Sequence, residues 1–256
     1  MPVRISCSGW NEATLRDLRI GCCGFPVSLV RYAREFPVVE VQQTFYQPPL
    51  PKTLERWRRL VPADFEFTLK AWQLITHEPS SPTYRRLREK LSERQKRETG
   101  GFRLSRTVMD GWHRTLECAR VLRARIILFQ CPASFAPTRE NTFRLRAFFR
   151  EIRRAPGEVK GVKFAWEPRG DWNLEEVRGL CQELKLVHAV DPFAQEPATG
   201  KPGYFRLHGR GGYRYRYTDQ DLGQLLDIAR RCRPCYVLFN NISMLEDARR
   251  FAKLAS

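Results

Sequence analysis

The chain has 256 residues, 42% of them hydrophobic and 12% aromatic, which is enough to bury the core of one large domain or two small ones. That composition excludes a disordered tail protein. Lys and Arg number 45 against 28 Asp and Glu, and the formal net charge of +17 predicts a polyanionic partner. Because an Arg-rich genome or a heat-adapted surface would also raise the share of Arg, both explanations stay open.

The sequence carries neither a membrane segment nor paired sets of metal-binding cysteines. No stretch approaches the roughly 18 consecutive apolar residues of a membrane span, and residues 1–11 lack the apolar core of a secretory signal. We therefore expect a cytoplasmic protein with no membrane partner. The single C-x-x-C, Cys232 to Cys235, has no second pair at zinc-ribbon spacing, so we expect a local disulfide or two reduced thiols there.

Short runs rich in β-branched and aromatic residues recur along the chain, with amphipathic segments between them, which is typical of a parallel sheet built from βα units. Eight runs fit strands: 19–23, 38–42, 66–70, 125–130, 161–166, 186–190, 204–208 and 236–240. Helical spacing of apolar residues predicts helices over 52–60, 142–153, 174–184 and 219–232. Asn173 and Thr218 stand where the N-caps of the last two belong.

Eight strands alternating with helices predict the α/β class and a single (β/α)8 TIM-barrel domain over residues 1–256. Its strands and helices would occupy residues 19–241, with a basic insertion at 79–107 between the third and fourth strands. A doubly wound sheet is the alternative.

In most of the predicted strands, alternate residues near the carboxyl end are polar. Its members are Glu40, Gln42, Thr68, Lys70, Gln130, Lys163, Glu167, Asp191, Arg206, His208 and Asn240. Their neighbours along the strands are apolar and suit packing against outer helices. Because buried ionisable groups are costly unless they are paired or used, this set predicts an active site inside the barrel mouth. Structural salt bridges, such as Glu167 with Arg206, are the alternative.

Motifs spread over residues 19–241 carry a family resemblance. They run in the order Ile20-Gly21, Gly24-Phe25, Val39-Glu40-Val41, Thr44-Phe45-Tyr46, Phe67 with Lys70, Ile75-Thr76-His77, Gln130 with Pro132 and Ser134-Phe135, Glu167 with Arg169 and Trp172, Asp191, Arg206-Leu207-His208-Gly209 and Phe239-Asn240-Asn241. With these motifs the sequence resembles the YecE-like family, domain of unknown function 72, whose members are compact TIM barrels. Gln42, Cys22-Cys23 and Phe25 depart from the family pattern and indicate a divergent member.

The resemblance implies the fold and little chemistry, so the function is argued from the residues. Lys70 is the strongest candidate for a nucleophile. Desolvation and a nearby Arg206 would lower its pKa and free its amine to attack a carbonyl or the C1′ of an abasic sugar. A salt bridge to Glu40 or Glu167 would instead keep Lys70 charged and inert.

Carboxylates and imidazoles could supply acid–base chemistry. Glu167 and Asp191, on neighbouring predicted strands, form a plausible pair for proton transfer or water activation, and His208 or His77 could transfer protons or bind a metal. We expect catalytic roles for Lys70, Glu167, Asp191, His208 and Glu40. We expect substrate binding by Thr44, Tyr46, His77, Gln130, Arg169, Arg206 and Asn240. No cofactor is firmly implied; a divalent metal at the carboxylates and His208 stays open, whereas four scattered His argue against a three-zinc site.

Two segments favour nucleic acid as the partner. Residues 83–106 hold nine basic side chains against three acidic ones, among them Arg85, Arg86 and Arg88. After the seventh strand, aromatic and basic residues interleave in a glycine-flanked loop that offers both stacking and phosphate contacts. Its candidate contacts are Arg210, Tyr213, Arg214, Tyr215, Arg216 and Tyr217. A solvated hairpin is the alternative.

The leading hypothesis is an enzyme that excises or cleaves at a damaged or unpaired nucleotide, of the glycosylase/lyase or endonuclease type. A hydrolase, lyase or isomerase acting on a small phosphorylated or sugar-like substrate is the alternative from the same scaffold. The third hypothesis is a barrel that binds nucleic acid without catalysing a reaction. The sequence gives no indication of the oligomeric state.

Overall fold

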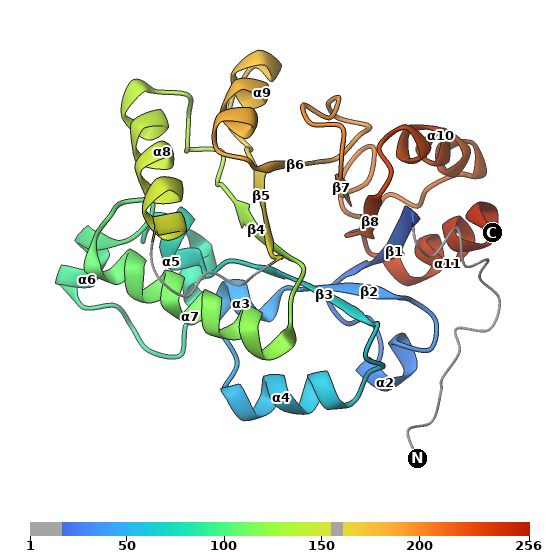
Figure 1. The fold of residues 1–256 in the computed structure, drawn as a ribbon, viewed down its shortest axis with the longest axis horizontal. Coiled ribbons are helices and arrows are strands. Elements are labelled where there is room, and N and C mark those ends of the chain that lie inside the picture. Colours follow the sequence, from blue (N-terminus) through green and yellow to red (C-terminus); the bar gives the residue numbers. More distant parts are fainter. Residues whose placement is uncertain (1–16, 155–160) are drawn as a thin grey trace.

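The computed structural model of the protein describes residues 17–154 and 161–256 and forms a closed barrel of parallel strands (Figure 1). Each strand is hydrogen-bonded to the next in chain order, and the last closes against the first. The strands are β1 (Leu18–Cys23), β2 (Val38–Val41), β3 (Glu66–Lys70), β4 (Ile126–Gln130), β5 (Lys163–Glu167), β6 (Val187–Val190), β7 (Gly203–Leu207) and β8 (Cys235–Phe239). The predicted TIM barrel is confirmed, and the doubly wound sheet is wrong.

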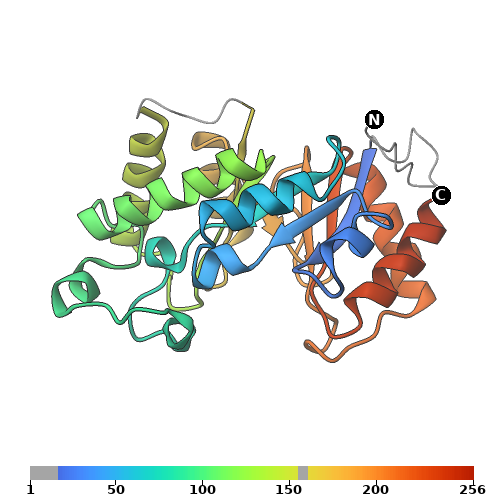
Figure 2. The same cartoon turned by 90° about the horizontal axis from the view of Figure 1, so that it is seen from below.

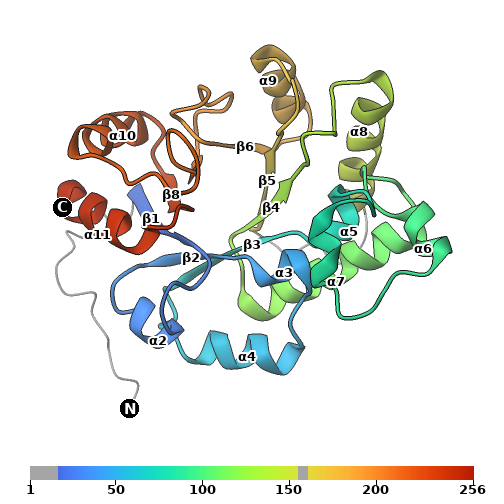
Figure 3. The ribbon, with the colours of Figure 1, turned by 180° about the vertical axis from the view of Figure 1, so that it is seen from behind.

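Helices surround the barrel on its outside, as the views from front and back show (Figures 1 and 3). The longer helices are α4 (Pro51–Arg59), α7 (Arg106–Leu122), α8 (Arg139–Arg154), α9 (Leu174–Glu183), α10 (Asp219–Arg231) and α11 (Met244–Ala255). Shorter ones are α2 (Leu29–Tyr32), α3 (Gln43–Tyr46), α5 (Gln73–Thr76), the 3-10 helix η1 (Pro82–Arg86) and α6 (Glu93–Glu98). Within the described ranges, no helix is long and apolar enough to cross a membrane. Residues 1–11, on which the secretory-signal argument rests, lie outside those ranges.

The predicted strands coincide with the observed ones, with ends shifted by at most two residues. Asn173 and Thr218 are N-caps as predicted, and each belongs to a capping box. In both, the cap side chain accepts a hydrogen bond from the third helical residue, whose carboxylate accepts one from the cap's N–H. Cys232 and Cys235 are free thiols, so the disulfide alternative is wrong.

The core has two shells, because alternate strand residues face opposite sides of the barrel wall. Outward residues such as Phe67, Phe129 and Phe205 pack under the helices. Inward apolar residues fill the barrel interior: Cys23, Val38, Ile126, Leu128, Ala165, Val187, Ala189, Tyr204 and Leu238. On several strands, a residue of the polar set follows two positions after one of these inward apolar residues. Those polar side chains therefore lie directly above the apolar layer, toward the carboxyl ends of the strands.

The insertion between β3 and β4 is built on η1 and α6 and lies to one side of the barrel (Figure 2, teal). Arg103 ties its end to its beginning, because Nη1 donates to Glu78 Oε1 at 2.7 Å and to the Thr99 carbonyl at 2.6 Å. Glu98 also accepts a 2.6 Å hydrogen bond from the Thr107 hydroxyl at the start of α7. These contacts hold the basic segment beside the carboxyl ends of the strands.

Candidate functional site

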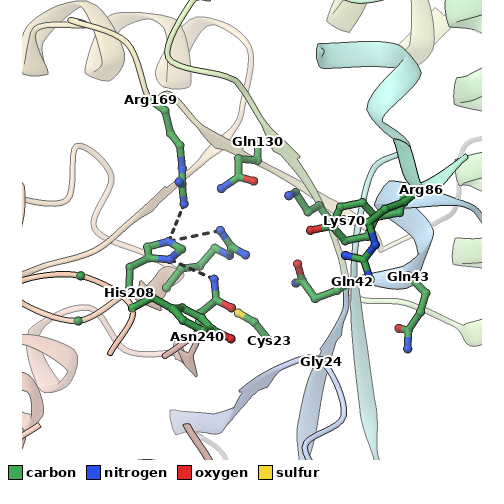
Figure 4. A pocket seen from close by; sticks show the side chains of 15 residues that line it. Cys23, Gly24, Gln42, Gln43, Lys70, Arg86, Gln130, Arg169, His208 and Asn240 are labelled. Atoms are coloured by element: carbon green, nitrogen blue, oxygen red, sulfur yellow. Dashed lines mark hydrogen bonds between the residues drawn. The ribbon is translucent and has the colours of Figure 1, made fainter. Parts of the chain in front are cut away.

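A cavity of about 670 Å³ opens at the carboxyl ends of the strands. In Figure 4, Arg169, His208 and Asn240 lie on one side, Lys70 and Arg86 face them from the other, and Gln130 lies between. The cavity is lined by Cys23, Gly24, Gln42, Gln43, Tyr46, Lys70, Arg86, Gln130, Arg169, Arg206, His208, Gly209, Gly212, Tyr213 and Asn240. Its position is that of the active site in enzymes built on this fold.

The charged side chains of the lining are all basic. They are Lys70, Arg86, Arg169 and Arg206, with the imidazole of His208 beside them, and no Asp or Glu appears among the lining residues that the structure describes. Four amide side chains, Gln42, Gln43, Gln130 and Asn240, add hydrogen-bonding groups. Such a lining selects an anionic ligand, with phosphate or carboxylate oxygens as the matching groups.

A buried ion network underlies the cavity and centres on Arg206, which is 1% exposed. Arg206 Nε donates to both Glu40 oxygens at 3.1 Å, and Nη2 donates to Glu40 Oε1 at 2.9 Å. Arg206 Nη1 donates to Glu167 Oε2 on the other side. Burial by itself would lower the pKa of Arg206, but Glu167 and Glu40 raise it well above its ordinary value. Arg206 is thus a permanent cation between two carboxylates.

Glu40 is fully buried and has every acceptor occupied. Besides Arg206, the Tyr204 hydroxyl donates to Glu40 Oε2 at 2.7 Å, and Gln42 donates to Oε1. Glu40 does not line the cavity. The geometry therefore makes Glu40 the anchor of Arg206, in line with the salt-bridge alternative, and leaves it no contact through which to act on a substrate.

Lys70 is almost fully buried, yet its amine has no carboxylate partner among the described residues. Its Nζ lies 3.5 Å from the centre of the Phe45 ring, which offers a cation–π contact. Burial, followed by the charge of Arg206, lowers the pKa of Lys70 to about 7, against the opposing pull of Glu167 and Glu40. The alternative of a salt bridge to Glu40 or Glu167 is wrong in this structure.

His208 is held at both ring nitrogens. Arg169 Nη2 lies 2.9 Å from His208 Nε2, and Asn240 Nδ2 lies 3.0 Å from Nδ1. Since a guanidinium only donates, Nε2 is the acceptor of the Arg169 contact, and the same nitrogen lies 3.5 Å from Glu167 Oε1. His208 thus lines the cavity with Nε2 held between Arg169 and the Glu167 carboxylate.

Glu167 orients the groups around it. Gln130 Nε2 donates to Oε1 at 2.9 Å and Arg169 Nε donates to the same oxygen at 2.8 Å. Burial by itself would raise the pKa of Glu167, but Arg206 and the neighbouring donors hold it well below its usual range. A carboxylate held ionised in this way is a poor general base and a good fixed charge.

Asp191 does not join Glu167. Its Oδ2 accepts the backbone N–H of His208 at 2.8 Å, and its Oδ1 accepts that of Phe193 at 3.1 Å. Asp191 is absent from the cavity lining, so the predicted carboxylate pair does not form and Asp191 fixes the backbone of His208 instead. No group of three or more His, Cys, Asp or Glu that could hold a metal ion occurs over residues 17–154 and 161–256.

Three further predicted substrate-binding residues fall into two groups. Tyr46 lines the cavity. Thr44 is buried beneath it, where its hydroxyl donates to the Lys70 carbonyl at 2.7 Å, and His77 bonds through Nδ1 to the Thr76 hydroxyl at 2.8 Å. Burial and the charge of Lys70 lower the pKa of His77 to about 3. Thr44 and His77 therefore support the wall of the cavity.

The loop at 209–217 combines anchoring and exposed residues. Tyr217 is buried, and its hydroxyl accepts the Gly209 N–H at 2.8 Å. Asp221 binds two more of the residues that we expected to contact nucleic acid. It accepts hydrogen bonds from Arg210 Nη1 at 2.6 Å and from the Tyr215 hydroxyl at 2.7 Å. Tyr213 lines the cavity and is 55% exposed. Arg214 and Arg216 are exposed, with Arg216 Nη2 3.8 Å from Glu246.

The insertion contributes one residue to the cavity. The Arg86 guanidinium stacks 3.8 Å from the centre of the Tyr46 ring. Arg85 and Arg88 are exposed beside it but do not line the cavity. The sequence predicts Tyr46 as a substrate-binding residue and Arg86 as a nucleic-acid contact, and the fold joins them in one stacked pair.

Some lining residues were missed as site residues. Gln42 shares the inward parity of Glu40, so the alternation of β2 already pointed to it, and Cys23 ends β1 on the inner face. Gln43 follows the strand in the first turn of α3, and no strand periodicity could place it. Tyr204 reads as an apolar strand residue, whereas its hydroxyl bonds Glu40 and, at 2.9 Å, Thr68.

Comparison with known proteins settles the family. Residues 4–256 match the family described as protein of unknown function DUF72. The chain belongs to this family. The UPF0759 protein YunF of Bacillus subtilis (strain 168) is 24% identical, over 84% of this chain and 80% of that protein.

Solved structures of this family share the fold. A DUF72 family protein of Enterococcus faecalis V583 is 21% identical, with a TM-score of 0.68 over 93% of this chain and 96% of that one. Another, from Thermotoga maritima MSB8, is also 21% identical, with a TM-score of 0.62 over 93% and 98% of the two chains. A D-psicose 3-epimerase is 12% identical, with a TM-score of 0.54 over 89% of each chain. At such identities the likeness extends to the fold alone.

Proposed function

We propose that this DUF72 barrel is an enzyme that processes nucleic acid at a damaged or unpaired nucleotide, with Lys70 as its amine nucleophile. One observation carries the proposal: a lysine with its pKa lowered to about 7 opens into a basic cavity without a carboxylate partner within the described chain. About half of such amines are neutral at pH 7, so they can attack an electrophilic carbon.

The cavity and its surroundings suit a nucleotide. Pockets for ligands of that size have volumes of about 300–1,000 Å³, and this cavity has about 670 Å³. Arg169, 42% exposed at its side chain, can move to meet a phosphate, and the Arg86–Tyr46 stack offers a flat surface to a base. Exposed Arg85 and Arg88 on one side and Arg214 on the other extend the positive charge beyond the mouth.

The chemistry would begin at the aldehyde of an abasic sugar. The Lys70 amine forms a bond to C1′ while the carbonyl π pair moves to oxygen. The oxygen takes up the two protons that the amine loses and leaves as water, and the nitrogen lone pair forms the C=N bond of an imine. His208, which lines the cavity, takes the C2′ proton at Nε2 once Arg169 has turned from that nitrogen to the phosphate. The released electron pair forms a C=C bond, and the C3′–O bond breaks with the 3′-phosphate as leaving group.

The test uses purified protein and end-labelled single- and double-stranded oligonucleotides with abasic, deaminated or oxidised sites. Borohydride should trap a covalent adduct with the abasic strand, and Lys70→Ala should abolish it. Lys163→Ala is the matched control, because Lys163 is exposed at the amino end of β5, away from the cavity. Absence of an adduct, or equal trapping with Lys70→Ala, would contradict the proposal.

A small phosphorylated carbonyl sugar is the second candidate, favoured by a specific observation. Arg210 and Tyr215 are bound to Asp221, and Tyr217 is buried, so the loop presents less nucleic-acid surface than its sequence indicates. The same borohydride experiment separates the two. Trapping of a sugar phosphate aldehyde but not of an abasic oligonucleotide would favour the small substrate.

A further inference from the structure

Two large apolar side chains are exposed together at the rim of the cavity. Tyr213 is 55% exposed and Ile242 is 60% exposed. The two backbones are neighbours, because the Ile242 N–H donates to the Tyr213 carbonyl at 2.9 Å. We call this pair the Tyr213–Ile242 ridge. Because Tyr213 lines the cavity, this apolar pair is placed to contact a ligand that extends beyond the cavity mouth.

The backbone under the ridge is firmly held. Gly212 N–H donates to Gly209 O at 3.2 Å, and Tyr215 N–H donates to Gly212 O at 2.9 Å. Gly209 has φ +90°, and a Cβ there would lie 2.3 Å from the Gly212 oxygen, so the turn requires glycine. Asn241 Nδ2, next to Ile242, donates to the Tyr215 carbonyl at 2.7 Å. The ridge is thus rigid before any partner arrives.

The charges around the ridge define the partner. Arg214 follows Tyr213, is exposed and makes no ion pair with any described residue, and Arg216 lies two residues on. Tyr213 itself lines the same cavity as the basic side chains of Lys70 and Arg169. An apolar projection beside the unpaired guanidinium of Arg214 in the described structure, with the exposed Arg216 close by, matches stacked bases flanked by phosphates.

We propose that the Tyr213–Ile242 ridge enters a nucleic-acid duplex and fills the gap left by the nucleotide that is drawn into the cavity. This inference rests on the proposed function and extends it to double-stranded substrates. Withdrawing a nucleotide costs a few kcal/mol of stacking and pairing, and an inserted apolar side chain offsets part of that cost. A single strand has no gap to fill, so the ridge should matter for duplexes alone.

The experiment compares wild type with Ile242→Ser, which changes the ridge residue that does not line the cavity, on one abasic strand, alone and in a duplex. Borohydride trapping on the duplex should fall at least about tenfold, whereas trapping on the single strand should change less than about twofold. Leu254→Ser is the matched control, because Leu254 is 47% exposed near the end of α11, at the amino side of the barrel. Urea unfolding of all three proteins checks that the surface changes leave the fold intact.

A second measurement is independent of chemistry. A duplex carries a non-cleavable abasic analogue with 2-aminopurine as the neighbouring base, whose fluorescence should change on wild-type binding and stay unchanged with Ile242→Ser. Equal trapping by both proteins on the duplex, or equal loss on both substrates, would overturn the ridge inference while leaving Lys70 chemistry standing. No adduct with wild type on either substrate would remove the proposed function, and the ridge inference with it.

Discussion

Lys70 should weaken the fold at neutral pH, because its burial is unfavourable while the amine is charged. The perturbation is Lys70→Met, which keeps the length and apolar stem of the side chain and removes the charge. In the unfolded chain the lysine has a pKa of 10.5, whereas burial and Arg206 lower the folded value to about 7. The unfolded state therefore binds more protons between these values, and stability gains with rising pH there.

The magnitude follows from the two pKa values. At pH 7 the difference corresponds to about 4 kcal/mol of lost stability, and this cost should shrink by about 1.4 kcal/mol per pH unit between pH 8 and pH 10. Below pH 7 the cost levels off, because the folded amine is then protonated as well. Lys70→Met should remove this cost, apart from a cation–π contact with Phe45 worth about 1–2 kcal/mol.

The assay is urea unfolding of wild type and Lys70→Met at pH 6 to 10, under reducing conditions because the described cysteines are free. The stability gain of the variant should be largest at pH 6 to 7 and fall to a small value by pH 10. Contributions from the other titrating groups cancel in the difference between the two proteins. A gain that stays constant with pH would show that the pKa of Lys70 is not lowered. A variant less stable than wild type at every pH would refute the reasoning outright, since Lys70 would then stabilise the fold.

Four other predictions follow from particular contacts. Glu40→Ala should lower the free energy of unfolding by about 3–5 kcal/mol, because it leaves Arg206 charged and half-paired in the core; a loss below about 1 kcal/mol in urea unfolding would contradict this. Thr218→Ala should cost about 1 kcal/mol in the same assay through the lost helix cap, and Thr218→Ser should restore most of it. The His77 ring, with its pKa lowered to about 3, should show no NMR titration between pH 8 and 5. Arg214→Gln should reduce the salt dependence of single-strand binding by about 0.7 in log–log slope, and an unchanged slope would remove Arg214 from the binding surface.

The sequence predicted the barrel because its signals are local. The strands, the capping residues Asn173 and Thr218, and the alternation that turns Glu40 and Arg206 inward depend on near neighbours in the chain. All are found as predicted, with strand ends shifted by at most two residues. The alternation holds because side chains in a strand point to opposite faces with a period of two. Local pattern could therefore state which side chains meet inside the barrel mouth.

Local pattern could not state which of those side chains pair with one another. Arg206 binds Glu40 and Glu167 from strands far apart in the chain, while Lys70, with the same inward parity, reaches Phe45 and no carboxylate in the described structure. Asp191 turns to backbone N–H groups instead of facing Glu167. The sequence by itself thus determined the barrel and most of the inward polar residues. The tertiary structure decided their partners and placed Lys163, a predicted member of that set, exposed at the amino end of β5. The reason is that pairing depends on distances across the barrel, and on the competition of several donors for each carboxylate, which no spacing along the chain records.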